Sequence, residues 1–353
     1  MSDRSISIPA VAGPLIPRVR CAPFREGLDA DPIGSAGAYD GFLVCDVGLP
    51  WASEVTAQSP LQEMISGPAG SVVGGNGDKW RVIARVPAPE RAADGLRRIT
   101  EHRVRRCEVD GLAMRGPFVS REWIVAPERV IPLGRAILGL GQLDGQPPVD
   151  PAELNDHVEP ATMQLAMCTH GSRDTCCGGV GTHLYEALAG TFARSGATVR
   201  RERISHTGGH RFAPTAITFP DGYAWAHLDE ATCELIVSRA EPPERCAEHC
   251  RGSSFLAGAP AQAADRAALV AVGWDWADAA RGVQLAAFDR STMSTTVRIS
   301  GLLPDGQVRS FDVTSAPDRH IPSPTCGGID RPEYKTDTVW RVDRVDEVDA
   351  ASV

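Results

Sequence analysis

The sequence predicts an α/β protein of two or three domains, and three observations lead to this class. The chain has 353 residues, which at roughly 150 residues per domain is enough for two or three hydrophobic cores. Short apolar runs typical of strands alternate with segments whose apolar residues recur at helical spacing. The proline-rich stretch at residues 147–151 (PPVDP) is the clearest linker, so we expect a domain boundary near residue 150.

The first 150 residues are expected to hold several strands and a helix, after an irregular segment that extends to about residue 35. Residues 89–103 carry apolar side chains at helical spacing. The arginines between 97 and 106 are therefore expected on a solvated face near the end of this helix. The glycine-rich segment GPAGSVVGGNGD matches no phosphate-binding motif and predicts a surface loop. Strands are expected at residues 41–47, 80–86, 105–109 and 123–126.

The remainder of the chain predicts a second α/β segment and then a C-terminal extension. Helical spacing is present at residues 180–194 and 260–280. Residues 296–313 have the pattern of a strand, a Pro-Asp-Gly turn and a second strand, which is typical of a hairpin. The acidic tail from Asp343 is expected to be frayed. Further strands are expected at residues 162–167, 199–204, 216–219, 223–228 and 233–237.

Charge and hydropathy exclude two classes of partner. The formal net charge is −9, whereas proteins that bind nucleic acids need a strong positive field. No apolar run reaches the roughly 18 residues of a membrane-spanning helix, and the N-terminal residues lack the apolar stretch of a signal peptide. We therefore expect a cytoplasmic protein that binds neither nucleic acid nor membranes. In that reducing compartment, ten cysteines indicate ligands or buried thiols rather than disulfides.

Cysteines and histidines cluster in two short segments of the second half. The run CTHGSRDTCC places Cys168 and Cys177 with eight residues between them. After a predicted helix and strand, SHTGGHRF places His206 and His210 four positions apart, with a Gly-Gly pair that favours a tight loop over a helix. Thiolates and imidazoles are ligands for zinc, copper or iron–sulfur clusters. Structural zinc sites usually have about two to four residues between paired cysteines, so the longer loop favours a larger Fe2S2 core.

Neighbouring residues are candidates for supporting roles at such a site. Within the first segment, backbone N–H groups and Ser172 can donate hydrogen bonds to cluster sulfurs, and Arg173 adds positive charge. His170 is expected to hydrogen-bond the backbone or a sulfide. Arg211 directly follows His210 and is expected either to tune the cluster or to face a partner.

The two segments, followed by a Pro-Asp-Gly hairpin, resemble the sucrase/ferredoxin-like family, most closely over residues 160–240. Weaker similarity extends to Cys21, to the FLVCD strand and to Thr325-Cys326-Gly327. The resemblance implies a thioredoxin-like ferredoxin core at residues 151–250, with an additional N-terminal α/β domain at 1–150. Residues 251–353 would then form a C-terminal helix plus β-hairpin extension.

The resemblance also implies a chemistry. It implies one 2Fe–2S cluster, with Cys168, Cys177, His206 and His210 as the cofactor-binding metal ligands. The protein would then be an electron carrier for redox partner proteins, a reductase or an oxidase, rather than an enzyme with its own substrate. Two neutral imidazoles make such a site less negative than four thiolates, so we expect a raised potential, as in Rieske centres. Oxidation favours proton loss from the free ring nitrogen, so we also expect the potential to depend on pH.

Several alternatives remain at this stage. Cys176 precedes Cys177 directly and can compete with it as a ligand, whereas Cys246 and Cys250 are interpreted as non-ligands despite their Cys-x3-Cys spacing. The same two cysteines and two histidines can instead form a structural zinc site. A third hypothesis is a thiol–disulfide oxidoreductase that uses Cys176 and Cys177, although the Cys-x-x-Cys spacing is missing. The other cysteines are interpreted as structural thiols, namely Cys21, Cys45, Cys107, Cys233 and Cys326.

Overall fold

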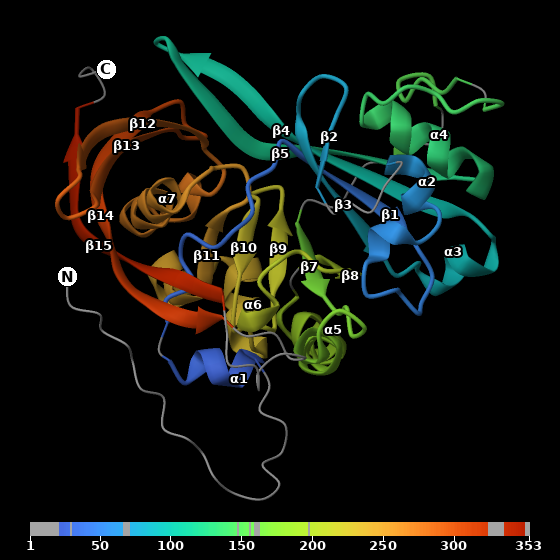
Figure 1. The fold of residues 1–353 in the computed structure, drawn as a ribbon, viewed down its shortest axis with the longest axis horizontal. Helices are drawn as coiled ribbons and strands as arrows, with labels where there is room; N and C mark the ends of the chain where they lie inside the picture. Colours follow the sequence, from blue (N-terminus) through green and yellow to red (C-terminus); the bar gives the residue numbers. More distant parts are fainter. Residues whose placement is uncertain are drawn as a thin grey trace, which may run out of the picture.

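A single mixed β-sheet connects all parts of the described chain (Figure 1). The structure is a computed structural model that describes residues 21–28, 30–65, 71–146, 148–154, 157–158, 163–196, 198–323 and 335–349. Cys326 and the segment around it lie outside these residues. The main path of the sheet has the strand order β11-β10-β9-β7-β8-β3-β1-β4-β5-β12-β13-β14-β15. Among the described residues, no helix combines the length and the apolar character needed to cross a membrane.

The N-terminal part of the sheet has the order β3-β1-β4-β5 and packs its own core. Two fully buried tryptophans, Trp80 and Trp123, lie in this core. Its strands are β1 (Gly41–Asp46), β2 (Ser71–Val73), β3 (Lys79–Arg85), β4 (Arg97–Val109), β5 (Leu112–Val125) and β6 (His157–Val158). Its helices are η1 (Val55–Ala57), α2 (Leu61–Ile65), α3 (Pro89–Ala93) and α4 (Pro127–Ile137), whereas α1 (Cys21–Glu26) precedes the sheet and packs against η3 (His210–Phe212).

The helix expected at residues 89–103 is wrong beyond its first turns. Helix α3 ends at Ala93, and Gly95 adopts a left-handed φ of 71°, which interrupts helical hydrogen bonding. Strand β4 begins at Arg97, and Ile99 is buried on it. The arginines at 97–106 therefore lie on a long strand and not at a helix end. The strands expected at 41–47 and 80–86 are confirmed by β1 and β3.

The middle part of the sheet has the order β8-β7-β9-β10-β11. Its strands are β7 (Gln164–Cys168), β8 (Arg200–Ile204), β9 (Ala216–Phe219), β10 (Tyr223–Trp225) and β11 (Cys250–Ser253). Its helical segments are η2 (Cys177–Gly181), a π-helical turn, α5 (Thr182–Ser195), η3 (His210–Phe212), α6 (Glu230–Ser238) and η4 (Pro243–His249). The strand expected at 233–237 is wrong, because these residues belong to α6. Asp229 caps that helix by accepting a hydrogen bond from the Thr232 N–H at 2.7 Å.

The same four-strand arrangement occurs twice in the chain. In β3-β1-β4-β5 and in β8-β7-β9-β10, the first two strands are parallel and the remaining neighbours are antiparallel. The two units join where Arg85 of β3 pairs with Ile204 of β8, in antiparallel direction. Across each unit, Arg85 pairs with Asp46 and Ile204 pairs with Cys168. Asp46 in the first unit therefore occupies the position that Cys168 occupies in the second.

Buried charges hold the two units together. Arg85 contacts Asp46 at 2.7 Å and Glu202 at 3.3 Å, and all three side chains are at most 1% exposed. Arg98 contacts the same Glu202 carboxylate at 3.1 Å. Burial acts to raise the pKa of Glu202, but the charges of Arg85 and Arg98 lower it to about 2. The position in β1 that matches Cys168 thus holds Asp46, which is ion-paired with Arg85. The predicted boundary near residue 150 remains a prediction.

The C-terminal strands curve around one helix (Figure 1). Helix α7 (Ala259–Val272) and the short η5 (Trp274–Trp276) pack against strands β12 (Ala280–Asp289), β13 (Ser294–Leu302), β14 (Val308–Ser323) and β15 (Lys335–Val348). The hairpin expected at 296–313 is confirmed as β13 and β14, and β12 and β15 extend it on either side. The helix expected to reach residue 280 ends at Val272. The tail expected to be frayed from Asp343 is instead part of β15 up to Val348.

Candidate metal centre

Cys168 and Cys177 are brought together by the turn that connects β7 to α5. Cys168 is the last residue of β7, and Cys177 is the first residue of η2. Three glycines allow the backbone to close on itself here. A Cβ on Gly178 would lie 2.2 Å from the Cα of Gly171, and one on Gly181 would lie 2.5 Å from the carbonyl oxygen of Cys168. The glycines of CTHGSRDTCCGGVG therefore make the approach of the two cysteines possible.

The two thiols are buried and hydrogen-bonded to each other. Cys168 is 1% exposed and Cys177 is fully buried. The hydrogen bond with Cys177 lowers the pKa of the Cys168 thiol well below its ordinary value; burial opposes this shift, and a hydrogen bond with His206 adds to it. The same bond, together with burial, raises the pKa of Cys177. Cys168 is thus the more acidic thiol of the pair, and His206 is within hydrogen-bonding reach of it.

The HTGGH segment forms a tight loop after β8, as the sequence predicts. Gly208 and Gly209 have φ angles of 88° and 81°, in the left-handed region that disfavours other residues. The loop places the rings of His206 and His210 with their centroids 5.7 Å apart and their planes tilted by 40°. Both imidazoles are partly buried. This loop places His206 within hydrogen-bonding reach of the Cys168 thiol and His210 beside Cys21 and Asp174.

A buried arginine lies beneath this loop. Arg251 of β11 is 2% exposed and donates to the carbonyl oxygen of Gly208 at 3.0 Å. A Cβ on Gly209 would meet its guanidinium at 2.4 Å, so this position also needs glycine. Burial lowers the pKa of Arg251 to about 10, and the thiols of Cys177 and Cys168 act in the opposite direction. Arg251 therefore remains charged at neutral pH and offsets negative charge at the two thiols.

The N-terminal unit supports both ligand-bearing segments. The ring of His170 bridges the two units: Nε2 donates to the carbonyl oxygen of Ala52 at 2.8 Å, and Nδ1 accepts from the backbone N–H of His206 at 3.2 Å. Burial lowers the pKa of His170, so its neutral form is favoured. The hydroxyl of Ser172 donates to the carbonyl oxygen of Trp51. His170 thus makes the backbone contacts that the sequence predicts for it.

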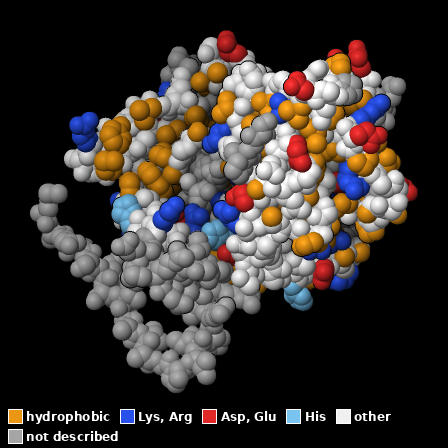
Figure 2. All heavy atoms as spheres, turned by 45° about the vertical axis from the view of Figure 1, so that its right-hand side comes forward, with side chains coloured by type: hydrophobic (Ala, Val, Ile, Leu, Met, Phe, Trp, Pro, Cys, Tyr) orange, Lys and Arg blue, Asp and Glu red, His pale blue; other side chains and the backbone are white. Residues whose placement is uncertain are grey.

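A cavity of about 290 Å³ opens beside His206. Arg81 and Val82 of β3, the segment Ser53–Thr56, His170 and Arg173 also line it. Arg81 donates to the carbonyl oxygen of His206 at 2.7 Å. Arg173, predicted to add positive charge, pairs with Glu54 at 3.0 Å, and both side chains are exposed. Basic side chains also gather near the middle of one face, with histidine atoms beside them (Figure 2).

Arg211 points to a different neighbour. Its guanidinium pairs with Asp337 of β15 and lies 4.5 Å from the centre of the Phe212 ring. This contact ties the loop that carries His210 to the C-terminal strands. Its expected influence on a cluster or partner remains a prediction.

Two groups at the site were not among the predicted ligands. Asp174 Oδ2 lies 3.1 Å from Nδ1 of His210, and the Cys21 thiol donates to the same carboxylate at 3.4 Å. Burial acts to raise the pKa of Asp174, but the contacts with His210 lower it to about 2. Cys21 also lies 3.9 Å from the Sγ of Cys176. Cys21 was expected to be a structural thiol; 153 residues separate it from Asp174, so spacing alone gives no signal for this contact.

The remaining described cysteines lie in other parts of the molecule. Cys246 and Cys250 belong to the main hydrophobic core together with Cys233, apart from the cluster that holds Cys168 and Cys177. Burial raises the pKa of Cys246 to about 12 and that of Cys250 further. Such thiols are inert at neutral pH, in agreement with the interpretation of Cys246 and Cys250 as non-ligands.

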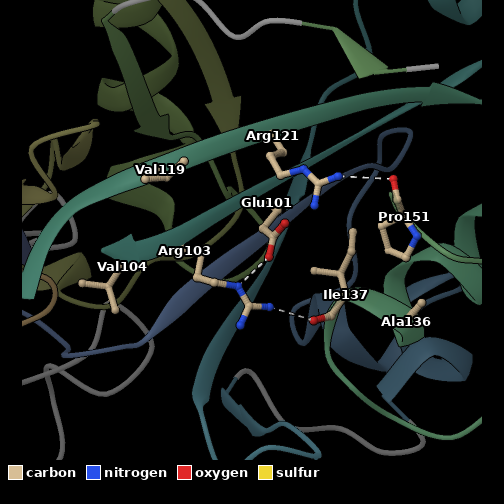
Figure 3. Close-up of a pocket in the computed structure, with 8 residues that line it drawn as sticks. All are labelled: Glu101, Arg103, Val104, Val119, Arg121, Ala136, Ile137 and Pro151. Carbon is tan, nitrogen blue, oxygen red and sulfur yellow. Dashed lines mark hydrogen bonds and ion pairs between the residues drawn. The ribbon is translucent and has the colours of Figure 1, made fainter. Parts of the chain in front are cut away.

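A second cavity, of about 350 Å³, lies between β4, β5 and α4 (Figure 3). Its polar side chains are engaged with one another and with the backbone. Arg103 contacts Glu101 at 2.8 Å, and Arg121 donates to the carbonyl oxygen of Pro151 at 3.3 Å. The predicted ligands do not line this cavity, so it is separate from the candidate metal centre.

Comparison with known families identifies the chain. The family described as sucrase/ferredoxin-like matches residues 32–252. The chain belongs to the sucrase/ferredoxin-like family. The match includes both four-strand units and ends at β11, so the sucrase/ferredoxin-like region contains all four predicted ligands. Neither the curated proteins nor the solved structures give a significant match.

The donor set of this family member fits a 2Fe–2S cluster. Of the two buried thiols, Cys168 has a lowered pKa and lies within reach of His206, and the ring of His210 neighbours that of His206 on the glycine-shaped loop. Thiolate and imidazole are the ligand types of such clusters. The backbone N–H of His170 donates to Cys168, and the buried Arg251 supplies positive charge.

Proposed function

We propose that the protein is an electron carrier with one 2Fe–2S cluster held by Cys168, Cys177, His206 and His210. The observation that carries this proposal is the position of the Cys168 thiol, within hydrogen-bonding reach of both Cys177 and His206. The ring of His210 lies next to that of His206. When bound, the cluster would accept and release single electrons, so the protein would need no substrate pocket of its own.

We also propose that the unit containing β8-β7-β9-β10 is a thioredoxin-like ferredoxin core. Its two parallel strands are connected through α5, an antiparallel hairpin follows, and α6 comes after the hairpin. The first unit has the same strand order but carries Asp46 where the second carries Cys168. Its role would be to support the ligand loops, as the contacts of His170 and Ser172 suggest.

The chain's own residues would set the properties of the centre. Burial of both thiols keeps water from Cys168 and Cys177. The charged guanidinium of Arg251 favours an added negative charge, and neutral imidazole ligands do the same. Both effects raise the reduction potential above that of a site with four cysteines. Asp174 holds Nδ1 of His210, which leaves Nε2 of that ring for iron.

Electrons would enter and leave near His206, where the cavity reaches the ring. Its rim carries the exposed Arg173–Glu54 pair, which gives a redox partner protein charges of both signs to recognise. We propose that a reductase or an oxidase docks there. A cytoplasmic location agrees with nine described cysteines outside any disulfide.

Metal and sulfide analysis of anaerobically purified protein tests the proposal. We expect two irons and two inorganic sulfides per chain, and a visible absorption that dithionite bleaches. Cys168→Ser should lose both iron and sulfide, whereas Cys107→Ser, on the partly exposed part of β4, should keep them. Colourless protein with zinc at these four residues would support a structural zinc site instead. Metal-free protein with a dithiol redox couple at Cys176 and Cys177 would support an oxidoreductase.

A further inference from the structure

Three metal-binding side chains converge at a second point beside the candidate cluster site, and His210 lies next to two of them. Cys21 comes from α1, Asp174 and Cys176 from the turn before η2, and His210 from the HTGGH loop. The ligand atoms of the first three lie within 4.8 Å of one another, and all three residues are buried. Three separate segments of the chain therefore direct sulfur, oxygen and nitrogen atoms toward one another.

The measured distances fit two edges of a tetrahedral zinc site. Zinc bonds of about 2.3 Å to sulfur and about 2.0 Å to oxygen give a sulfur–sulfur edge of about 3.8 Å and a sulfur–oxygen edge of about 3.5 Å. Cys21 Sγ lies 3.9 Å from Cys176 Sγ and 3.4 Å from Asp174 Oδ2. His210 Nδ1 lies 3.1 Å from Asp174 Oδ2 and 3.7 Å from Cys21 Sγ, so it borders this group as a partner of the carboxylate.

We propose that Cys21, Asp174 and Cys176 bind one zinc-class divalent cation, distinct from the proposed 2Fe–2S cluster. The carboxylate of Asp174 is oriented for this role, because its Oδ1 accepts the backbone N–H of Cys176 at 2.9 Å while Oδ2 faces Cys21 and is held by Nδ1 of His210. Binding releases the two thiol protons to solvent, and the thiolates and carboxylate then offset the charge of the cation.

The position of this site gives it a structural consequence. Cys176 directly precedes Cys177, and His210, a proposed iron ligand, contacts Asp174 of the zinc donor set. An ion here would fix α1 against the turn and the loop that carry the proposed iron ligands. Only the assignment of His210 to iron rests on the proposed function. The donor set for zinc itself does not.

The test counts zinc, iron and sulfide in the same full-length samples, after supply of zinc and removal of weakly bound ions. The wild type should hold one zinc per chain in addition to iron. Cys21→Ser and Cys176→Ser should each weaken zinc binding by more than about 100-fold, since loss of a supporting residue alone costs about 10–100-fold. Both variants should keep iron and sulfide. Cys107→Ser serves as the cysteine control and should keep both metals.

Cobalt titration of the Cys168→Ser chain separates this proposal from the proposed function. Without a cluster the sample is colourless, so one cobalt per chain should give thiolate charge-transfer bands and the visible bands of tetrahedral cobalt. Those bands should vanish when Cys21→Ser is added to Cys168→Ser. Equal zinc binding by wild type and Cys21→Ser would overturn the site, and so would loss of iron in place of zinc from Cys176→Ser. A Cys21–Cys176 disulfide in zinc-supplied protein would overturn it too.

Discussion

Replacement of Gly178 by alanine should remove iron without unfolding the protein. The new Cβ would lie 2.2 Å from the Cα of Gly171, whereas carbon atoms in contact are separated by about 3.5 Å. The turn must therefore open by about 1.3 Å, next to Cys177. Metal–ligand distances tolerate only about 0.2 Å, so Cys168 and Cys177 would no longer hold one cluster. Such overpacking costs about 1–3 kcal/mol of folding free energy.

The assay compares Gly178→Ala with Gly48→Ala, which adds the same methyl group where no atom lies within 4 Å. Iron and sulfide are measured per chain, and thermal unfolding is followed without metal. We expect Gly178→Ala to lose most of its iron and to unfold a few degrees earlier, because about 1 kcal/mol shifts Tm by about 1–2 °C for a chain of 353 residues. Gly48→Ala should match the wild type. If Gly178→Ala keeps full iron and an unchanged Tm, the reasoning about this turn is refuted.

Three further predictions concern stability and the ligand loop. Glu202 has a lowered folded-state pKa of about 2, so its contribution to the free energy of unfolding is present above about pH 4.5 and is lost as pH falls toward 2. In urea titrations, the free energy of unfolding should therefore fall less between about pH 4.5 and pH 2 for Glu202→Gln than for the wild type. An equal fall would contradict this. Arg281→Leu leaves the buried Asp265 carboxylate without its 3.0 Å partner and should cost about 3–5 kcal/mol in the same assay, whereas a cost below about 1 kcal/mol would contradict the pairing. Ser172→Ala removes the bond to Trp51 and should speed iron loss to a chelator; an unchanged rate would argue against support by the first unit.

Local patterns in the sequence predict much of the fold because most elements carry their own periodicity. Strands β1, β3 and the β13–β14 hairpin follow the expected ranges. The errors occur where short apolar runs fit both periods. Residues 233–237 are rich in side chains that favour strands, yet the Asp229 cap and the burial of Cys233 and Ile236 on one face favour a helix. Packing against the rest of the fold therefore determined the secondary structure here.

The repeated four-strand unit was not predictable from sequence periodicity. Its two copies share strand order and a buried tryptophan at matching positions, Trp123 opposite Ile99 and Trp225 opposite Ala216. Few other residues mark the two four-strand units as equivalent. The pairing of Arg85 with Ile204 shows where the copies meet in the sheet.

The candidate site was predicted in part. Cys168, Cys177, His206 and His210 lie in two motifs whose spacing indicates a shared centre, and the structure brings the two motifs together. Cys21 and Asp174 escaped prediction because their contacts depend on how α1 packs against a turn far along the chain. Contacts at such sequence separation are set by the fold and leave no local pattern.

Pulsed EPR of the reduced protein detects nitrogen nuclei bound to the iron and therefore tests whether His206 and His210 are iron ligands. We expect two distinct nitrogen couplings in the wild type, with one lost in His206→Cys and the other lost in His210→Cys. A reduced cluster without nitrogen couplings, or with both couplings intact in either variant, would contradict the assignment of the two histidines to iron.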